Sequence, residues 1–405
     1  MFIYKAAVVG GGAMGAEIAQ VISYSGLPVV LKEVNEELAQ KALSKIRKIY
    51  QQRVEKGKMT PQELESKMAL VSVTTDYAAL KEVDIAIEAV PEKMDLKKKV
   101  FAEMDRMLPE QTILASNTSA LSISALGAAT KRPEKVIGIH FFYPAHVMKL
   151  IEVIPGLATS EDTVADSIAF CEGLRKLPVR VNECAGFLVN RLLMPYLNEA
   201  AFCAQEGGAT LKEIDETMVA FGFPMGPFTL VDALGLDVCY DVVGVLLEEY
   251  GSRMAPASLW DEVHRLKRFG VKNGAGFYNY NSDVQSDKTV DDILKKLKPT
   301  MGPKIPFSQE RLLLAMVNEA ALCIQEKITA PSDIDLAVLA GIGFPQTRGG
   351  VLQYADELGT DVVLQKLLEL SKAYGERFFP APLIRRMVLA GFLGKKTKRG
   401  FLEYA

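Results

Sequence analysis

The stretch that decides the fold of the first part of the chain is Ala7-Val8-Val9-Gly10-Gly11-Gly12-Ala13-Met14-Gly15. It predicts a β-strand that runs into a Gly-x-Gly-x-x-Gly turn and then into a helix. In such a turn Gly10 makes the tight bend, Gly12 lets the backbone approach a pyrophosphate, and Gly15 lets the helix pack closely on the strand. The amino end of the helix offers N–H groups and partial positive charge to phosphates. The alternative is a tight strand–helix turn without a ligand. In this context we predict dinucleotide binding by Gly10, Gly12, Ala13, Met14 and Gly15.

Glu33 stands 18 residues after Gly15, at the end of the second predicted strand. A carboxylate at this place accepts hydrogen bonds from the adenosine ribose hydroxyls and repels a 2'-phosphate. We therefore predict that the cofactor is NAD rather than NADP. The neighbouring Lys32 works against this preference.

The first 150 residues alternate short apolar runs with amphipathic stretches, which is typical of a parallel sheet flanked by helices. The predicted strands are 4–9, 29–32, 84–89, 112–116, 136–140 and 149–154, of which the last is expected to pair with its predecessor. The predicted helices between them are 13–25, 36–56 and 96–108. After residue 184 the pattern is helical and begins with a long helix over 187–205, in which Pro195 predicts a kink.

An internal repeat organises the helical part of the chain. Asn198-Glu199-Ala200-Ala201 recurs as Asn318-Glu319-Ala320-Ala321, and four further matches follow in the same order. The offset is 120 residues at first, then 121, then 124, which indicates two short insertions. We expect an α/β Rossmann-type domain with a mainly parallel sheet, followed by two repeated all-α domains. The predicted boundaries are 1–183 for the NAD-binding domain, 184–281 for copy 1, 282–304 for a connector and 305–405 for copy 2.

Composition excludes several classes of protein. The 405 residues carry 47 Lys plus Arg against 50 Asp plus Glu, so no basic excess points to nucleic acid or to an anionic membrane. The five cysteines are scattered and include no Cys-x-x-Cys pair, which argues against a disulfide framework and against a zinc site, so no metal is expected. No apolar run approaches the ~18 residues of a membrane span. No signal peptide precedes the first strand, and we expect a cytoplasmic protein.

The strongest catalytic candidate is His140, one of three histidines. It ends the predicted strand 136–140, at the carboxyl edge where ligands bind in open α/β sheets. Glu152 lies in the apolar run 149–154 on the neighbouring strand, where an ionised carboxylate needs a partner. A His–Glu pair fixes the imidazole tautomer and raises its basicity, as a general base near neutral pH requires. We therefore favour catalysis over a satisfied core histidine.

Three other features allow two interpretations each. Ser116-Asn117-Thr118-Ser119 follows the preceding strand and is either part of the site or a capped turn. Asn190, on the first long helix, is either a hydrogen-bond partner of a substrate carbonyl or hydroxyl, or a helix residue without a ligand. The basic segment 41–58 either attracts the phosphate groups of a ligand or is a solvated helix face, and Lys56 is its candidate for a direct contact.

Several motifs together resemble the (S)-3-hydroxyacyl-CoA dehydrogenases. They are the glycine turn, Ala115-Ser116-Asn117-Thr118-Ser119, Gly138-Ile139-His140-Phe141-Phe142-Tyr143-Pro144 and Gly186-Phe187-Leu188-Val189-Asn190-Arg191. Phe223-Pro224-Met225-Gly226-Pro227-Phe228 and Gly274-Ala275-Gly276-Phe277-Tyr278 extend the resemblance over essentially the whole chain. The repeated half is similar to the dehydrogenase portion of bacterial multifunctional fatty-acid oxidation proteins.

The resemblance implies a general base, His140, with Glu152 as its partner, and substrate-site residues Ser119 and Asn190. It also implies NAD contacts from Glu33, Glu92, Lys97, Ser119 and Lys272. The family usually has Asn where this chain has Tyr143. A phenol cannot copy the paired donor and acceptor of an amide, so Tyr143 is expected to alter the contacts near the nicotinamide or to reshape the acyl pocket.

The predicted reaction is NAD-dependent interconversion of (S)-3-hydroxyacyl-CoA and 3-ketoacyl-CoA, in fatty-acid β-oxidation or butyrate-type metabolism. One alternative is a β-hydroxyacid dehydrogenase acting on a free acid, although such enzymes rely on a catalytic lysine. The other is a non-enzymatic NAD-binding protein. Copy 2 carries Glu310 where copy 1 has Asn190. We therefore expect one active site and an internal pseudo-dimer that buries an apolar face, with any homo-oligomer formed through another surface.

Overall fold

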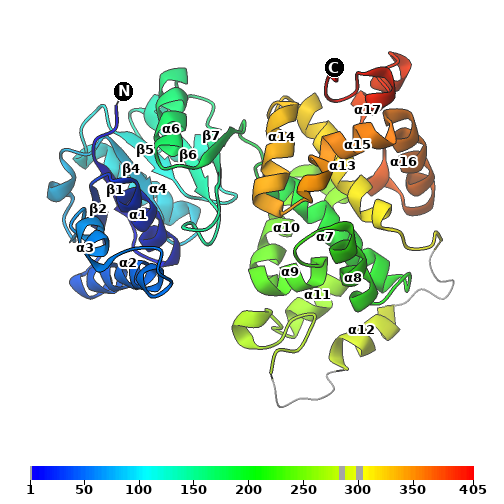
Figure 1. Cartoon of the computed structure of the whole chain (residues 1–405), viewed down its shortest axis with the longest axis horizontal. Helices are drawn as coiled ribbons and strands as arrows, with labels where there is room; N and C mark the ends of the chain where they lie inside the picture. Colours follow the sequence, from blue (N-terminus) through cyan, green and yellow to red (C-terminus); the bar gives the residue numbers. More distant parts are fainter. Residues whose placement is uncertain (1, 282–287, 298–303) are drawn as a thin grey trace. The chain divides into compact units, whose positions relative to one another are not determined.

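The computed structural model describes residues 2–281, 288–297 and 304–405. The chain forms two compact units, Met1–Phe187 and Leu188–Ala405, which are drawn in Figure 1. Part of the expected connector 282–304 lies outside the described residues. Within it, the helix α12 (Thr289–Leu297) buries Val290 and Ile293 and packs against α11 (Ser258–Arg265), so this part of the segment belongs to the helical unit.

The described residues of the first unit form an eight-stranded sheet in the order β3-β2-β1-β4-β5-β6-β7-β8. The strands are β1 (Ala6–Val9), β2 (Val29–Lys32), β3 (Val71–Thr74), β4 (Ile85–Glu88), β5 (Ile113–Ser116), β6 (Val136–Phe141), β7 (Leu150–Pro155) and β8 (Leu177–Arg180). Their pairings are parallel, except that β6 and β7 are antiparallel. The predicted α/β fold is thus confirmed.

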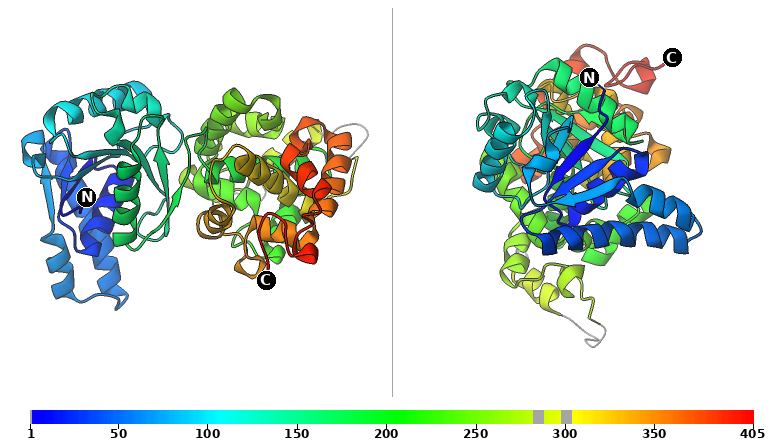
Figure 2. Two further views of the ribbon diagram at one scale, coloured as in Figure 1. Left: turned by 90° about the horizontal axis from the view of Figure 1, so that it is seen from above. Right: turned by 90° about the vertical axis from the view of Figure 1, so that its left-hand side faces the viewer.

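Helices cover both faces of this sheet (Figures 1 and 2). Alternate strand residues such as Ala6 and Val8 share one buried cluster with apolar residues of α1 (Ala13–Ser25), α2 (Glu36–Glu55), α3 (Pro61–Met68) and α6 (Glu161–Gly173). The helices α4 (Met94–Met107) and α5 (Ile123–Gly127) pack against β5 and β6 outside that cluster. All four residues of β1 are buried, as expected for a strand that has helices on both sides.

The strand register aligns the polar strand ends. Glu88, the last residue of β4, is the Cα partner of Val9 on β1 and of Ser116 on β5. On the next pair of strands, His140 is the Cα partner of Glu152. The strand order reverses direction between β1 and β4, and at such a point open α/β sheets bind their ligands.

The sequence-based assignment missed β3 and β8. Both are edge strands, and their burial is incomplete: β3 is half-exposed, and β8 has exposed residues at both ends and Pro178 inside. They therefore lack the continuous apolar run of a central strand. The predicted strand 4–9 begins instead at Ala6, because the backbone N–H groups of Tyr4 and Lys5 donate to the carboxylate of Asp84.

The described residues of the second unit form five pairs of repeated helices. Copy 1 has α7 (Val189–Gln205), α8 (Leu211–Phe221), α9 (Pro227–Leu234), α10 (Leu236–Tyr250) and α11, and copy 2 has α13 (Gln309–Gln325), α14 (Pro331–Ala337), α15 (Val351–Leu358), α16 (Thr360–Tyr374) and α17 (Pro382–Leu389). The change of offset from 120 to 121 coincides with a π-helical turn, Val338–Ile342, which accommodates one extra residue. The change to 124 coincides with the short 3-10 turn Gln346–Arg348.

The two copies pack on each other through reciprocal contacts, with α7 against α13. A Cβ added to Gly222 would meet Pro345 at 2.9 Å, and one added to Gly343 would meet Pro224 at the same distance. Aromatic rings such as Phe223 and Phe344, 5.4 Å apart, supply the apolar part of this face. The sequence predicted an apolar face between the two copies. The observed face is apolar only in part, because buried Arg–Glu ion pairs also connect the copies across it.

Candidate active site

The glycine turn has the tight geometry that the sequence predicts. Gly10 has a φ of +101°, and a Cβ there would lie 2.9 Å from the carbonyl oxygen of Ala89. A Cβ on Gly15 would lie 1.8 Å from the carbonyl oxygen of Gly10, so only glycine allows this helix to pack on this strand. A Cβ on Gly12 would meet no atom of the described residues within 4 Å. Gly12 therefore faces open space at the amino end of α1, where Ala13 and Met14 begin the helix, and a pyrophosphate fits there.

Glu33 directly follows β2 and lies against this turn. Its carboxylate accepts hydrogen bonds from the backbone N–H of Gly11 at 2.5 Å and from that of Val34 at 2.9 Å. The ammonium of Lys32 lies 4.5 Å from the centre of the Tyr77 ring. The acidic side chain is thus held beside the glycine turn, in the place that a ribose acceptor requires, and Lys32 has an aromatic partner of its own.

His140 and Glu152 form a buried pair at the ends of β6 and β7. Their Nδ1 and Oε2 atoms lie 2.7 Å apart, and the residues are 6% and 0% exposed. The imidazole packs near two aromatic rings, with ring centres 4.4 Å away for Phe142 and 5.9 Å away for Phe187. Because Glu152 occupies Nδ1, Nε2 is the nitrogen that can exchange a proton with a ligand.

Phe187 is a contact that the sequence did not predict. It is 1% exposed, and its φ of +49° is unusual for a residue other than glycine. It is also the last residue of the first unit. Because this buried residue packs near the imidazole, it limits the positions that the His140 side chain can adopt. The sequence pattern could not reveal this contact.

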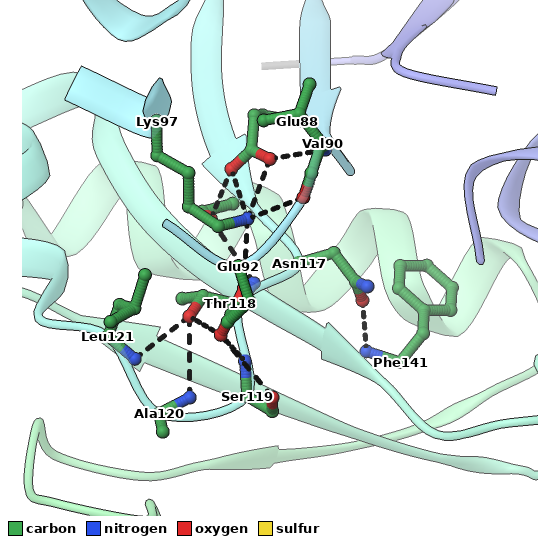
Figure 3. A network of polar contacts seen from close by, with 11 residues as sticks. Glu88, Val90, Glu92, Lys97, Asn117, Thr118, Ser119, Ala120, Leu121 and Phe141 are labelled. Carbon is green, nitrogen blue, oxygen red and sulfur yellow. Dashed lines mark hydrogen bonds and ion pairs between the residues drawn. The ribbon is translucent and has the colours of Figure 1, made fainter. Parts of the chain in front are cut away.

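A second polar cluster lies at the ends of β4 and β5 (Figure 3). Lys97, from α4, donates to the carboxylate of Glu88 at 2.7 and 3.0 Å and lies 3.2 Å from the carboxylate of Glu92. Glu92 in turn accepts hydrogen bonds from the hydroxyl of Thr118 at 2.5 Å and from the backbone N–H of Ser119 at 2.9 Å. The structure therefore brings the predicted residues Glu92, Lys97 and Ser119 together, and adds Glu88 and Thr118.

The charges of this cluster are balanced by close donors. Burial alone would raise the pKa of Glu92, but the ammonium of Lys97 and the hydrogen bonds from Thr118 and Ser119 lower this pKa below its usual value. Glu92 is therefore ionised at neutral pH. Asn117 accepts a hydrogen bond from the backbone N–H of Phe141 at 2.8 Å, and so connects the end of β5 to the strand that carries His140.

The remaining predicted site residues have different surroundings. Asn190 and Lys272 belong to the second unit. Lys272 is ion-paired with Asp237, and the corresponding residues of copy 2, Lys396 and Asp361, form the same ion pair. A repeated ion pair indicates a packing function for Lys272, besides the cofactor contact that the resemblance implies.

Tyr143 and Lys56 are both accessible to solvent. The residue Tyr143 is 67% exposed, and Lys56 is exposed at the carboxyl end of α2. Part of the basic segment 41–58 is already paired, since Arg47 binds Glu65 and Lys41 binds Glu37. The segment thus has fewer charges to offer to coenzyme A than its sequence suggests.

The described part of the chain has neither a metal-binding cluster nor a membrane-spanning helix. Among residues 2–281, 288–297 and 304–405, no group of three or more His, Cys, Asp or Glu side chains is arranged to hold a metal ion. In the same part of the chain, no helix has the length and apolar character needed to cross a membrane.

Comparisons with known proteins place the chain in a family. Residues 5–184 match the model of the 3-hydroxyacyl-CoA dehydrogenase NAD-binding domain. Residues 186–280 and 307–404 each match the C-terminal domain of the same family, so the repeat consists of two such domains. The cofactor of this NAD-binding domain is NAD.

Curated relatives and solved structures agree with this match. The chain is 40% identical over 394 residues to the fatty acid oxidation complex subunit alpha of Shewanella amazonensis. The aligned region covers 96% of this chain and 56% of that protein. The chain thus spans little more than half the length of such relatives. The structure of 3-hydroxybutyryl-CoA dehydrogenase from Escherichia coli superposes with a TM-score of 0.87 at 29% identity, covering 96% of this chain and 99% of that one.

A shorter solved structure matches the chain in part. It is the (S)-3-hydroxybutyryl-CoA dehydrogenase of Ralstonia eutropha, with a TM-score of 0.68 and 39% identity over 69% of this chain and all of that one. With both domain models matched over nearly its whole length, the chain belongs to the 3-hydroxyacyl-CoA dehydrogenase family of NAD-dependent oxidoreductases.

Proposed function

We propose that the chain interconverts (S)-3-hydroxyacyl-CoA and 3-ketoacyl-CoA, with His140 as the acid–base residue. The observation that carries this proposal is the buried pair of His140 and Glu152, 2.7 Å apart at a sheet edge. In the oxidation, Nε2 of His140 accepts the proton of the 3-hydroxyl group, and the carboxylate of Glu152 stabilises the imidazolium that results. NAD, when bound, accepts the hydride from C3 of the substrate.

We infer the functions of the other site residues from where they lie in the fold. Gly10, Gly12 and Gly15 shape the pyrophosphate turn, and Glu33 accepts hydrogen bonds from the adenosine ribose. Ser119 and Asn190 hold the reacting end of the substrate. We assign the nicotinamide side to Glu92, Lys97, Tyr143 and Lys272, and a coenzyme A phosphate contact to Lys56.

We also propose a metabolic context, a location and a domain division for the chain. The chain is assigned to fatty-acid or related acyl-CoA oxidation, a context that the name of the fatty acid oxidation complex subunit supports for that relative. We also assign the chain to the cytoplasm. The division into 1–183, 184–281, 282–304 and 305–405 is proposed as the functional one, with one active site per chain.

The experiment is a paired assay of NADH oxidation with acetoacetyl-CoA and with free acetoacetate. We expect the enzyme to turn over acetoacetyl-CoA, and we expect the rate with free acetoacetate to be at least tenfold lower. Equal rates would favour the free-acid alternative. Tight binding of NADH without turnover of 3-ketoacyl-CoAs of any chain length would favour the alternative that the chain is a non-enzymatic NAD-binding protein.

A further inference from the structure

Tyr143 lies on an exposed part of the loop between β6 and β7, but the chain is anchored on both sides of it. The residue itself is 67% exposed. Before it, the backbone N–H of Phe141 donates to the side chain of Asn117 at 2.8 Å (Figure 3). After it, Ala145 is 1% exposed and belongs to the buried apolar cluster that includes residues of α1. The position of Tyr143 therefore depends on how Ala145 is held.

Two ionisable side chains from other elements hold the backbone at Ala145. Glu17, from α1, is 9% exposed and accepts a hydrogen bond from the Ala145 N–H at 2.5 Å. Lys176, from the turn between α6 and β8, donates to the carbonyl oxygen of Ala145 at 2.6 Å and to that of Met148 at 2.7 Å. Buried backbone groups require partners, and hydrogen bonds to ionised groups are the stronger ones. An anion and a cation thus clamp the same short segment.

The charges of this clamp depend on each other. Burial lowers the pKa of the Lys176 ammonium, and the negative charge of Glu17 works in the opposite direction. His146 places its Nδ1 atom 3.4 Å from the Glu17 oxygen that binds Ala145, and this buried nitrogen has no hydrogen-bond partner among the described residues. Loss of the Glu17 carboxylate would therefore leave the Ala145 N–H without its acceptor and Lys176 without its counter-charge.

We propose that Glu17 and Lys176 are positioning residues, which fix the loop 142–149 and through it the side chain of Tyr143. Glu17 belongs to the helix α1, whose amino end faces the pyrophosphate, so it joins the cofactor-binding helix to the loop that carries Tyr143. The inference rests on the proposed function, in which Tyr143 lies on the nicotinamide side. Both side chains act through the backbone of the loop.

The first test measures amide hydrogen exchange in the full chain without cofactor, by mass spectrometry of peptides that contain Ala145. The Ala145 amide should exchange at least tenfold faster in Glu17→Ala than in the wild type, because it loses its acceptor. Lys176→Met, which removes the donor to both carbonyl oxygens, should also accelerate exchange of the loop. The control is Glu172→Ala, which changes an exposed glutamate of α6 and should leave the loop unchanged.

Loop exchange at the wild-type rate in Glu17→Ala would overturn the proposal. Thermal unfolding shows whether each variant is folded. Should Glu17→Ala not fold, Lys176→Met decides, and a wild-type rate of loop exchange in that variant would overturn the proposal in the same way.

The second test separates positioning of Tyr143 from a merely structural function, by a double-mutant cycle between Glu17→Ala and Tyr143→Ala. The measured quantity is kcat/KM for acetoacetyl-CoA with NADH. Glu17→Ala should lower it by about tenfold, the equivalent of one hydrogen bond to a charged group. In the Tyr143→Ala background the same substitution should change kcat/KM less than about twofold, because Glu17 acts through Tyr143. Glu172→Ala should stay within about twofold of the wild type in both backgrounds.

Equal losses in the two backgrounds would overturn the proposal, and so would a Tyr143→Ala enzyme with the kcat/KM of the wild type. A wild-type enzyme that does not turn over acetoacetyl-CoA would refute the proposed function. The exchange experiment uses neither cofactor nor substrate, so it would still decide whether Glu17 and Lys176 hold the loop.

Discussion

Arg191 of copy 1 and Glu319 of copy 2 form a buried ion pair, 2.7 Å long, and the chain repeats it in reverse between Arg311 and Glu199 at 2.6 Å. The side chains of all four residues are at most 5% exposed. Each arginine also stacks on a tyrosine of its own copy, Arg191 on Tyr250 and Arg311 on Tyr374. Such reciprocal pairing is typical of an isologous interface, in which the same patch of two subunits forms both sides. Here the two sides are copy 1 and copy 2 of one chain.

Breaking one of these ion pairs should destabilise the helical unit. The substitution Glu319→Gln removes one of the two carboxylates that pair with the buried guanidinium of Arg191, and Glu326 remains as the other. The cost should therefore lie above about 1 kcal/mol and below the about 3–5 kcal/mol of a buried charge left without any partner. Its counterpart Glu199→Gln should have a similar effect. Glu216, in an exposed pair with Lys212, provides the control, and Glu216→Gln should cost less than about 1 kcal/mol. Urea unfolding measures these differences; an unfolding free energy for Glu319→Gln equal to that of the control would contradict the interpretation of the network.

Removal of copy 2 should produce a dimer. A fragment ending at residue 297 keeps α12 but loses Glu319, and it exposes Phe221 and Phe223, which pack against Phe344 in the whole chain. Because Glu199 is the counterpart of Glu319, Arg191 of one fragment can pair with Glu199 of another. Sedimentation velocity should show a dimer, and Glu199→Arg should weaken it. A fully active monomeric fragment would show that copy 2 does not cover this face.

The enzyme should prefer NADH to NADPH. The carboxylate of Glu33 is fixed by the N–H groups of Gly11 and Val34, so it cannot easily turn away from a 2'-phosphate. We expect a ratio of kcat/KM values of at least tenfold in favour of NADH, and a smaller ratio for Glu33→Gln. An NADPH preference in the wild-type enzyme would mean that Lys32, rather than Glu33, meets the ribose.

Asp335 should make the stability of the helical unit depend on pH. Burial raises the pKa of this carboxyl to about 6, even though it accepts the backbone N–H groups of Leu352 and Gln353. A pKa above the unfolded value of about 3.9 means that its contribution to stability is present below about pH 4 and is lost as the pH rises through about 6. The unfolding free energy of wild type minus that of Asp335→Asn should therefore fall by about 2 kcal/mol between pH 4 and pH 7. A difference that stays constant with pH would contradict this.

Local patterns were enough to predict the geometry of the glycine turn and the contact between His140 and Glu152. The glycine turn is contained in nine consecutive residues, and His140 and Glu152 end up opposite each other because they lie on consecutive strands. Pairing of consecutive strands is common, so the short separation of these two residues made their contact predictable.

Contacts that depend on side-chain packing could not be predicted in this way. The contact between Glu88 and Ser116 depends on the register of β4 with β5, and the enclosure of Lys97 depends on how α4 packs. The repeat was visible as matched segments, yet the ion pair of Arg191 with Glu319 requires knowing that α7 lies against α13. An apolar face was the natural expectation, because charged residues are seldom buried.

The central claim, that His140 exchanges the proton with the substrate, is tested most directly by the turnover of His140→Ala with acetoacetyl-CoA and NADH. The variant should keep its affinity for NADH and lose about 10² or more in kcat, because the group that donates the proton to the new 3-hydroxyl in this direction is gone, while the glycine turn and Glu33 remain. His264→Ala, which changes a histidine stacked on Tyr240 in the second unit, should keep wild-type kcat. A kcat of the His140→Ala variant close to that of the wild-type enzyme would contradict the account.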